Sequence, residues 1–343
     1  MKILFIKLGA LGGVLRATPL FTGLKKKYPE SELHVVTKTN AVDLLEGNKD
    51  IDRLWIWEND KEDLKKKHFD WIINTEDDVE TCTFAKRLNA RKFSGPYLSD
   101  AGNIVYTEDV SPWYDMGKIS RFGLERANEL KKKSSKKYQE IYSEILGFPN
   151  KNYPLILNLS ENEKKWSIQF RKEHSILDQE ILIGINTGAG TNWPLKSISI
   201  EKTVEIIEKL ANKNLKIVLL GGPDENERNK KILKNLNAKI INSGTQNTMR
   251  NFIKIINALD MIITSDTLAL HIAAALNKRI VSFFGPTSAE EIELYGNGVK
   301  IKPDSDCYCC FQKTHNKDVM CIDEIKTEDL IEAALNQIEY IRK

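Results

Sequence analysis

Cysteine is scarce in this sequence: it supplies five of 343 residues, and four of the five lie in one short stretch. Cys82 stands alone, whereas Cys307, Cys309, Cys310 and Cys321 are clustered. This usage argues against the disulfide framework of a secreted domain and fits a protein of the reducing cytoplasm. In that compartment a cluster of cysteines favours a metal site over disulfides.

Long apolar runs are also missing, and none reaches the ~20 residues that a membrane-spanning helix needs. The most apolar stretch, FIKIINALDMIITSDTLALHIAAAL, is interrupted by Lys254, Asp260, Asp266 and His271. The N-terminal MKILFIKLGALGGVL loosely resembles a signal peptide, but Lys7 splits its apolar part and no clear cleavage site follows. We therefore expect a first β-strand there and a cytoplasmic protein.

Neither sign of charge is in excess, because 51 Lys and Arg residues accompany 48 Asp and Glu residues. A net charge of +3 lacks the basic surplus of a nucleic-acid-binding protein, so we expect no nucleic-acid partner. The hydrophobic fraction of 41% is that of a globular protein. A chain of 343 residues is longer than one compact core normally uses, which predicts two domains.

Short apolar runs alternate with amphipathic helical stretches in both halves of the chain. This pattern is typical of α/β domains with parallel sheets, whose strands are buried on both faces. In the first half we expect strands at 2–8, 32–37, 52–57 and 69–74 and helices at 14–29, 40–47, 61–68 and 79–90. In the second half we expect strands at 181–186, 216–222, 238–243, 260–265 and 279–285 and helices at 201–213, 225–236, 249–259, 268–276 and 327–343.

The segments between these two halves are less regular. Residues 96–118 show no periodicity, residues 121–146 predict one long Lys-rich helix, and residues 147–160 are rich in proline and asparagine, which is typical of a linker. Ligands of doubly wound sheets bind outside the carboxyl ends of the strands, so two such edges would face each other across a cleft. The expected parts are a domain over 1–158, a domain over 159–325 and a final helix over 326–343.

A glycine-rich turn, LGALGGVLRATP, follows the first expected strand. Gly9, Gly12 and Gly13 allow a sharp turn and the close approach of a ligand. Their spacing is not G-x-G-x-x-G, and no acidic residue closes the next strand, which disfavours a nicotinamide-dinucleotide site. The turn contains no acid, base or nucleophile, and its spacing alone favours a tight turn without a ligand.

A second turn of this kind, INTGAGTNWPLKS, opens the second half of the chain. Gly188 and Gly190 free backbone N–H groups, the hydroxyls of Thr187 and Thr191 lie beside them, and Lys196 adds a positive charge. Backbone amides and a cation are what a diphosphate needs, so the turn is a candidate diphosphate site. The alternative is a solvated loop.

Two further stretches place polar residues at the carboxyl ends of expected strands. In LLGGPDENERN, Asp224 and Glu225 either complement a helix N-terminus or, in the case of Glu225, contact a ribose. In MIITSDTLALHIAAAL, Asp266 and Thr267 lie where a phosphate or a sugar would bind. His271 lies in the apolar helix that follows, where a hydrogen-bonded core histidine is the simpler explanation.

The stretch CYCCFQKTHNKDVMC has the spacing C-x2-C-x4-H-x5-C, through Cys307, Cys310, His315 and Cys321. Three thiolates and one imidazole are a normal tetrahedral set for zinc, and thiolates also suit iron. Four protein ligands leave no open position, so a metal here is expected to be structural. The alternative is a cluster of reduced thiols.

Five stretches occur in one order along nearly the whole chain: IKLGALGGVLRATPL, INTGAGTNWPLKS, LLGGPDENE, SDTLALHIAAAL and FFGPTSAEEIELYG. Together they resemble glycosyltransferase family 9, the heptosyltransferases of lipopolysaccharide assembly. The resemblance implies a GT-B fold, in which two Rossmann-like domains face each other across a cleft. The first domain would bind the acceptor, the second the donor nucleotide sugar, and the last helix would cross back onto the first domain.

The resemblance also implies roles for residues of the second domain. The turn at 187–190 and Lys196 would hold the diphosphate of a donor such as ADP-heptose. Glu225 would face the ribose, Met249 the adenine, and Asp266 with its neighbours the phosphates and the sugar. The expected donor-binding residues are Thr187, Gly188, Ala189, Gly190, Lys196, Glu225, Met249, Asp266, Thr267 and His271. The transfer would be inverting and would need no catalytic metal.

The family's first turn normally reads G-D, and its aspartate is the proposed general base. Here Gly13 stands in that position. The chain is then a weak or inactive member, or has lost the aspartate, or uses another carboxylate. Glu76, Asp77 and Asp78 in INTEDDVE end a strand of the same domain and are candidates, with a helix start as the alternative that we favour for Asp78.

We therefore expect an enzyme that transfers a heptose or related sugar from an ADP-sugar to a lipopolysaccharide core or other surface glycan. Its acceptor would be an anionic or lipid-linked glycan, met at the inner face of the inner membrane by peripheral association. The basic stretch KKKSSKK at 131–137 either contacts this acceptor or is solvated surface. A nucleotide-sugar-binding pseudoenzyme or scaffold is the main alternative, and a dinucleotide-dependent oxidoreductase is a further one.

Overall fold

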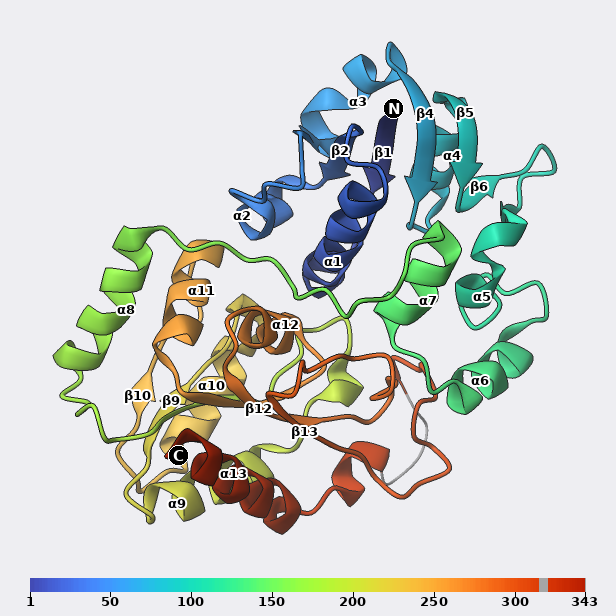
Figure 1. Ribbon diagram of the computed structural model, residues 1–343. Helices are drawn as coiled ribbons and strands as arrows, with labels where there is room; N and C mark the ends of the chain where they lie inside the picture. The colour runs from blue at the N-terminus through green and yellow to red at the C-terminus, as the bar shows by residue number, and fades with distance from the viewer. Residues whose placement is uncertain (315–319, 343) are drawn as a thin grey trace. The chain divides into compact units, whose positions relative to one another are not determined.

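The computed structural model describes residues 1–314 and 320–342 of the chain. They form two compact units, Met1–Asn158 and Leu159–Lys343. Each unit contains one parallel sheet with helices around it (Figure 1). The α/β class and the presence of two doubly wound units confirm the prediction from the alternating pattern.

The first sheet has the strand order β3-β2-β1-β4-β5, and every neighbouring pair is parallel. Its central strand is the apolar N-terminal run, which is buried from Ile3 to Ile6 because helices cover both faces. Figure 1 shows β1 beside β4, so the turns after these two strands share one edge. The strands are β1 (Lys2–Ile6), β2 (Glu32–Thr37), β3 (Arg53–Ile56), β4 (His68–Asn74) and β5 (Asn89–Ser94).

The long helix after β1 carries the main apolar face of this unit. Its Phe21 packs edge-on against Phe5 of the sheet, with ring centroids 5.1 Å apart. The other helices of the unit surround the same sheet. The helices are α1 (Leu11–Lys27), η1 (Thr39–Ala41), α2 (Val42–Leu45), α3 (Trp57–Lys65), α4 (Val79–Arg87), η2 (Glu108–Val110), α5 (Ser111–Tyr114), α6 (Leu124–Lys133) and α7 (Tyr138–Leu146).

Two expectations for the first unit are wrong. The predicted single helix over 121–146 is two helices, because the chain leaves α6 at Ser134 and restarts at Lys137, whose N–H donates to Glu140 Oε2 at 2.8 Å. Serine bonds readily to its own backbone and so favours such breaks. Residues 96–118 are not irregular: β6 (Pro96–Leu98) and β7 (Ile104–Tyr106) form an antiparallel hairpin.

The second sheet has the order β10-β9-β8-β11-β12-β13 and is also parallel throughout. Strands β8 and β11 are fully buried apolar runs. The strand expected at 238–243 is only two residues long. The strand β13, with the short sequence GVKI, is one that the sequence does not predict. The strands are β8 (Leu182–Asn186), β9 (Lys216–Leu219), β10 (Ile241–Asn242), β11 (Met261–Ser265), β12 (Arg279–Phe283) and β13 (Gly298–Ile301).

The helices of the second unit include one that the sequence does not predict, and they include the last helix of the chain. The unpredicted helix is α8, which directly follows the linker. The last helix, α13, supplies Leu330 and Ile338 to the same apolar core as Ile183 of β8, so it belongs to the second unit; its contact with the first domain stays a prediction. The helices are α8 (Glu161–Glu173), η3 (Pro194–Lys196), α9 (Ile200–Ala211), η4 (Pro223–Glu225), α10 (Asn226–Lys234), α11 (Met249–Ala258), α12 (Leu268–Ala275), η5 (Cys321–Glu324) and α13 (Thr327–Ile341).

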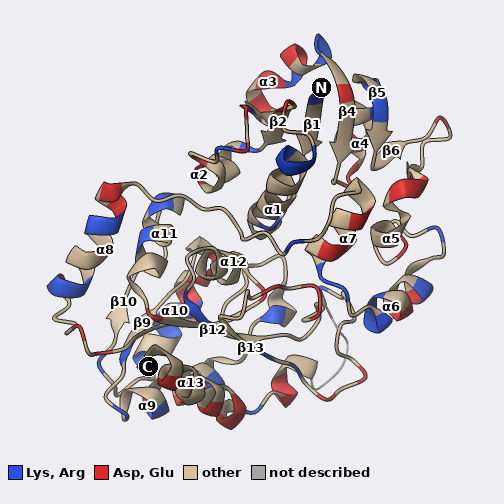
Figure 2. Cartoon of the chain, viewed as in Figure 1, with Lys and Arg blue, Asp and Glu red and all other residues tan. Residues whose placement is uncertain are grey.

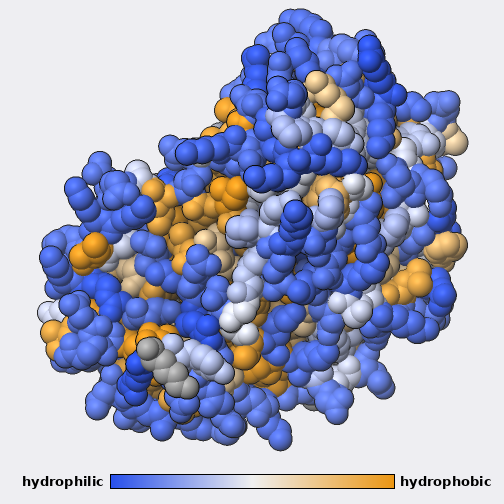
Figure 3. All heavy atoms as spheres, viewed as in Figure 1, coloured by the Kyte–Doolittle hydropathy of each residue, from blue (hydrophilic) through white to orange (hydrophobic). Residues whose placement is uncertain are grey.

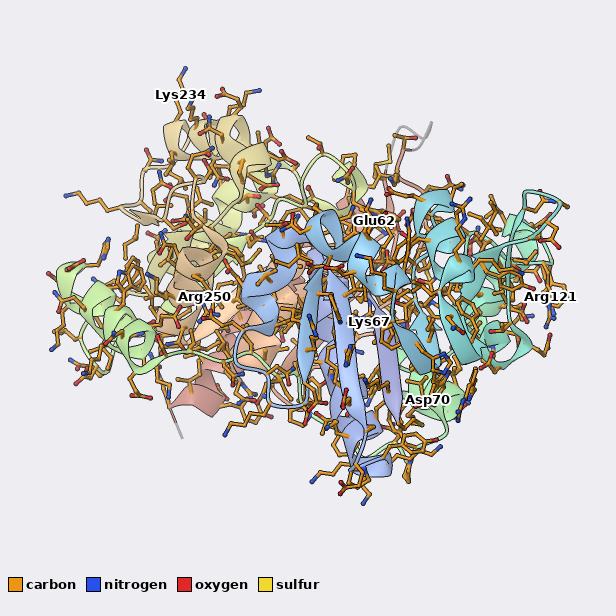
Figure 4. All side chains as sticks on the ribbon, turned by 90° about the horizontal axis from the view of Figure 1, so that it is seen from above. Glu62, Lys67, Asp70, Arg121, Lys234 and Arg250 are labelled. Carbon is orange, nitrogen blue, oxygen red and sulfur yellow. The ribbon has the colours of Figure 1, made fainter. Side chains whose placement is uncertain are left out.

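A charged pair joins α8 to α11. Arg250, labelled in Figure 4, lies near the start of α11, and its Nε donates to Glu163 Oε1 at 2.7 Å. Glu163 also accepts from the N–H of Ser160 at 2.8 Å and so caps its own helix. The Arg250 guanidinium holds the pKa of Glu163 at about 2, against the opposing effect of partial burial.

The surface seen in Figure 3 is mostly hydrophilic, with apolar residues in separate patches. None of the helices among the described residues is both long and apolar enough to cross a bilayer.

Candidate functional site

Lys196 and Asp266 form a nearly buried ion pair at the carboxyl edge of the second sheet. Lys196 lies in η3, after β8, and Asp266 directly follows β11. The Lys196 ammonium donates to Asp266 Oδ2 at 2.8 Å and to its backbone oxygen at 2.9 Å. The two side chains are only 13% and 12% exposed. A ligand anion that reaches Lys196 therefore meets a cation shielded from water, in competition with the Asp266 carboxylate.

Thr267 follows the aspartate of this pair in the chain, and His271 lies near its carboxylate. His271 is on α12 and 4% exposed, and its Nε2 lies 3.6 Å from Asp266 Oδ1, beyond hydrogen-bond distance. Thr267 Oγ1 accepts from Asn186 Nδ2 at 3.2 Å, which ties the end of β8 to the start of α12. The structure thus brings together the Lys, Asp, Thr and His that the sequence placed at this edge.

The carboxylate of Glu225 holds the glycine-rich turn after β8. It accepts from Gly190 N–H at 2.7 Å and from Gly222 N–H at 2.8 Å. A Cβ on Gly188 would lie 2.3 Å from Glu225 Cγ, and Gly190 has φ of +67°, so neither position tolerates a larger residue without rearrangement. Glu225 therefore shapes the turn, and a ribose contact through it stays a prediction.

Asp224 acts on the same turn. Its Oδ2 accepts from the N–H of Thr191 at 3.0 Å and from the Thr191 hydroxyl at 3.1 Å. The alternative in which Asp224 only complements a helix N-terminus is therefore too narrow. Ala189 and Met249 are half-buried; Met249 is the first residue of α11.

Arg228 is a functional candidate that the sequence analysis missed. It lies on α10, and its Nη2 donates to Thr187 Oγ1 at 3.1 Å and to the carbonyl oxygen of Ile198 at 2.6 Å. Burial lowers the pKa of Arg228, an effect that the carboxylates of Glu225 and Glu201 oppose. Its position three residues after Glu225, on the same face of the helix, is the signal that could have found it.

Two buried hydroxyls at the same edge have no hydrogen-bond partner among the described residues: Ser265 Oγ and Thr287 Oγ1. Ser265 ends β11 and pairs in register with Phe283 of β12, the strand that leads to Thr287. Ser265 is 1% and Thr287 7% exposed. Buried polar groups are normally paired, so both hydroxyls are suited to a ligand or a water.

In the first unit, Lys7 and Glu76 form a buried pair at the carboxyl edge of the sheet. Lys7 Nζ donates to Glu76 Oε1 at 2.6 Å, and the N–H of Leu8 donates to the same oxygen at 3.1 Å. Burial alone would lower the pKa of Lys7, but the Glu76 carboxylate raises it above the ordinary value. A Cβ on Gly9 would lie 2.6 Å from Glu76 Oε2, so the glycine turn is moulded around this carboxylate.

Gly13 lies in the first turn of α1, where no acidic residue is present. A Cβ at this position would lie 3.2 Å from Lys7 Cε and 3.7 Å from Lys7 Nζ. An aspartate here would therefore place its carboxylate beside Lys7, next to Glu76. Position 13, where the resemblance predicts the base, thus lies beside the ion pair of Lys7 and Glu76.

The two aspartates after Glu76 differ in what they do. Asp78 is the N-cap of α4 and accepts from Thr81 N–H at 2.9 Å and from the Thr81 hydroxyl at 2.7 Å. This confirms the helix-start interpretation of Asp78. Asp77 is exposed to solvent.

The basic stretch around α6 is largely engaged in pairs within its own unit. Figure 2 shows Lys and Arg along α6. Lys131 is buried over the ring of Trp113 at 4.3 Å. Arg121 pairs with Glu108 and Asp115, and Lys136 with Glu144, which leaves a mixed rather than a purely positive surface.

Cys307, Cys310 and Cys321 lie close to one another, although they come from two segments. Burial raises the pKa of Cys321 to about 12, and Cys307 and Cys310 add to the shift. Burial also raises the pKa of Cys310, and Cys307 adds to it. Over 1–314 and 320–342, no group of three or more His, Cys, Asp or Glu residues is arranged to hold a metal ion. The expected fourth ligand, His315, lies outside the described residues.

The sequence pattern of glycosyltransferase family 9 (heptosyltransferase) matches residues 60–320. The chain belongs to this family. A curated relative, lipooligosaccharide heptosyltransferase 2 of Campylobacter jejuni subsp. jejuni serotype O:2, is 31% identical over 114 residues, which cover 32% of this chain and 35% of the relative. The chain thus matches about a third of the length of that relative.

Solved structures of family 9 proteins resemble the chain over almost its whole length. The glycosyl transferase family 9 protein from Veillonella parvula DSM 2008 matches with a TM-score of 0.76 and 18% identity, covering 99% of this chain and 97% of that one. The Escherichia coli ADP-heptose lps heptosyltransferase II matches with a TM-score of 0.69 and 18% identity, covering 100% of both chains. At this identity the likeness shows the fold, and it confirms the predicted GT-B class with two Rossmann-like domains.

Proposed function

We propose that this family 9 protein is an inverting glycosyltransferase that moves a heptose or a related sugar from an ADP-sugar to a lipopolysaccharide core or other surface glycan. The observation that carries the proposal is the group at the edge of the second sheet. Lys196, Asp266 and His271 meet there beside a glycine turn whose shape is fixed by Glu225. The resemblance to an ADP-heptose-dependent enzyme supports the choice of donor.

The donor site is suited to a leaving diphosphate. In an inverting transfer the acceptor hydroxyl attacks the anomeric carbon as the bond to the diphosphate breaks. The developing negative charge on the diphosphate would be met by the Lys196 ammonium and by the N-terminus of α12. The buried hydroxyls of Ser265 and Thr287 would add hydrogen bonds without first having to give up partners of their own.

The base for the acceptor hydroxyl is the weak point of this chemistry. With Gly13 in the family's position, we propose Glu76 as the carboxylate that accepts the proton, and Asp77 as the second candidate. Glu76 is held at the sheet edge by Lys7, and its second oxygen, Oε2, lies against the glycine turn. Loss of a well-placed base typically costs ~10²–10⁴ in rate, so we expect transfer to be slow.

A transfer assay with ADP-heptose tests the proposed function. We expect release of ADP that depends on an added lipopolysaccharide-core acceptor and is lost in Lys196→Met. Lys278→Met is a matched control, because Lys278 is also a half-buried lysine, bonded to the carbonyl of Asn257 at 2.6 Å within the same unit. Acceptor-dependent release in the control and none in Lys196→Met supports the site; equal release in both contradicts it.

A catalytically inactive donor-binding protein is the second candidate. The absence of any acidic residue from the first turn of α1 favours it. Such a protein would bind ADP-heptose and yet show no turnover, even with an aspartate at position 13. The comparison of binding with turnover therefore separates the two candidates.

The partner and location follow from the same proposal. We propose that the first unit, 1–158, binds the acceptor and that the second, 159–325 with the final helix, binds the donor. The acceptor would be an anionic or lipid-linked glycan, reached by peripheral association at the cytoplasmic face of the inner membrane. Lys132 and Lys133 on α6 are the basic residues that we place toward it.

We further propose that the three neighbouring thiols of Cys307, Cys310 and Cys321 hold a structural zinc or iron, with His315 as the fourth ligand. The mutual effect of these cysteines on their pKa values supports the grouping. A tetrahedral thiolate site of this kind would have no catalytic role. Elemental analysis should find about one metal ion per chain; a correctly folded protein without metal contradicts the proposal.

A further inference from the structure

The loop from Thr187 to Ile198 connects β8 to α9 and carries the glycine turn and Lys196. Its two ends meet at one side chain. Arg228 Nη2 donates to the hydroxyl of Thr187, the first residue after β8, at 3.1 Å. The same nitrogen donates at 2.6 Å to the carbonyl oxygen of Ile198, two residues beyond Lys196.

A third contact extends this arrangement into α9. Arg228 Nη2 also lies 3.2 Å from Thr203 Oγ1, which in turn is 3.0 Å from Thr187 Oγ1. Thr203 is fully buried, and its hydroxyl donates to the carbonyl of Ser199 at 2.8 Å. Because a guanidinium nitrogen can only donate, the oxygens of Thr187, Ile198 and Thr203 share the N–H groups of Arg228 Nη2 as acceptors. Both ends of the loop therefore depend on one guanidinium.

Glu225 complements Arg228 from the same short segment. The two residues are three positions apart, so they lie on one face where η4 continues into α10. Glu225 holds the middle of the loop through the N–H of Gly190, and Arg228 holds its ends. Because an arginine remains charged in proteins, Arg228 also keeps a positive charge in contact with both ends of the loop.

We infer that Arg228 is a positioning residue for the donor diphosphate. It acts through the loop 187–198, by fixing the glycine turn and the Lys196 segment in one arrangement, and it does not itself contact the ligand. This inference rests on the proposed donor site. It assigns the diphosphate, rather than the nucleoside, as the part of the donor whose binding depends on Arg228.

The test compares the binding of ADP and of adenosine to Arg228→Met, measured by titration calorimetry below the melting temperature of every variant. Loss of charge-assisted hydrogen bonds should weaken ADP binding by about tenfold to a hundredfold. Adenosine, which lacks phosphates, should bind the variant as it binds the unmodified protein. Arg228→Lys, which keeps the charge with fewer donors, should restore part of the ADP affinity.

Arg171→Met is the matched control for general destabilisation. Arg171 also holds backbone oxygens, those of Ala258 at 3.0 Å and Glu180 at 2.9 Å, but at the amino ends of the strands of the same sheet. The Arg171→Met variant should have a lower melting temperature and an unchanged affinity for ADP.

Three results overturn the inference. The first is that Arg228→Met binds ADP as tightly as the unmodified protein does. The second is that this variant loses affinity for adenosine and for ADP to the same extent. The third is that Arg171→Met loses as much ADP affinity as Arg228→Met does. If the unmodified protein binds no ADP at all, the proposed donor site fails first, and the role of Arg228 fails with it.

Discussion

At the residue scale, we expect the residue at position 13 to set the rate at which this protein transfers a sugar. It lies in the first turn of α1, beside the ion pair of Lys7 and Glu76. A carboxylate at this point would be favoured by the helix N-terminus and by the nearby ammonium of Lys7. Glycine is also the poorest helix former after proline, so the position gains nothing in stability from it.

Gly13→Asp should therefore raise the rate of transfer by at least about tenfold, because it adds a base where the acceptor hydroxyl is expected. The side chain requires only a small shift of the flexible Lys7 methylene, 3.2 Å from the new Cβ. The measurement is the initial rate of ADP release with donor and acceptor in excess. Gly13→Asn is the control, since it has the same shape without a base. Equal rates for glycine and aspartate at this position contradict the account.

Some residues of the candidate site can be grouped from the sequence, and others cannot. Lys196, Asp266 and His271 could be grouped in advance, because parallel strands all end at one edge and each residue follows or lies near a strand end. Arg228 could not, because its contacts depend on how a long side chain crosses from α10 to the loop after β8. The pairing of Lys7 with Glu76 could not be predicted either, because it depends on the register in which β1 pairs with β4.

At the element scale, the pair of Glu163 and Arg250 is the clearest case of charge joining two helices. The depressed pKa of Glu163, about 2, arises first from the hydrogen bond to Arg250 and then, against partial burial, from the bonds to Ser160. A carboxyl whose pKa is lower in the folded state contributes stability above its unfolded pKa of about 4.3. That contribution is lost as the pH falls toward 2.

Glu163→Gln should thus lower the free energy of unfolding by about 2 kcal/mol near pH 7, and by clearly less near pH 3, where the contribution of the carboxylate is being lost. Urea titrations at the two pH values measure the difference. Glu161→Gln is the control in the same helical turn; it is exposed and pairs with Lys164 on the surface, so it should change little at either pH. A loss in Glu163→Gln that does not depend on pH means that the carboxylate charge is not what joins the helices.

Elements were predictable where apolar periodicity was strong and failed where it was not. The strands β1, β4, β8 and β11 are long apolar runs, and they lie where the pattern places them. The strand β5 has the sequence NARKFS, is mostly polar, and takes its place by pairing with β4. Tertiary pairing, rather than local propensity, forms such a strand.

At the scale of the whole molecule, the order of five motifs identified the family where the individual motifs did not. The division at Asn158 and Leu159 falls in the proline- and asparagine-rich linker. Each unit is a doubly wound sheet with its own core, and the groups of chemical interest gather at the carboxyl edge of each. We propose that the edge of the second sheet binds the diphosphate of an adenine nucleotide.

A thermal-shift panel of ADP, UDP, GDP, ADP-heptose and NAD tests this claim most directly, because it needs neither an acceptor nor a base. A ligand at 100 times its dissociation constant should stabilise the protein by about 2.7 kcal/mol. We predict that ADP and ADP-heptose raise the melting temperature and that the other three ligands do not. No shift with either adenine diphosphate, or an equal shift with UDP, GDP or NAD, would contradict the account.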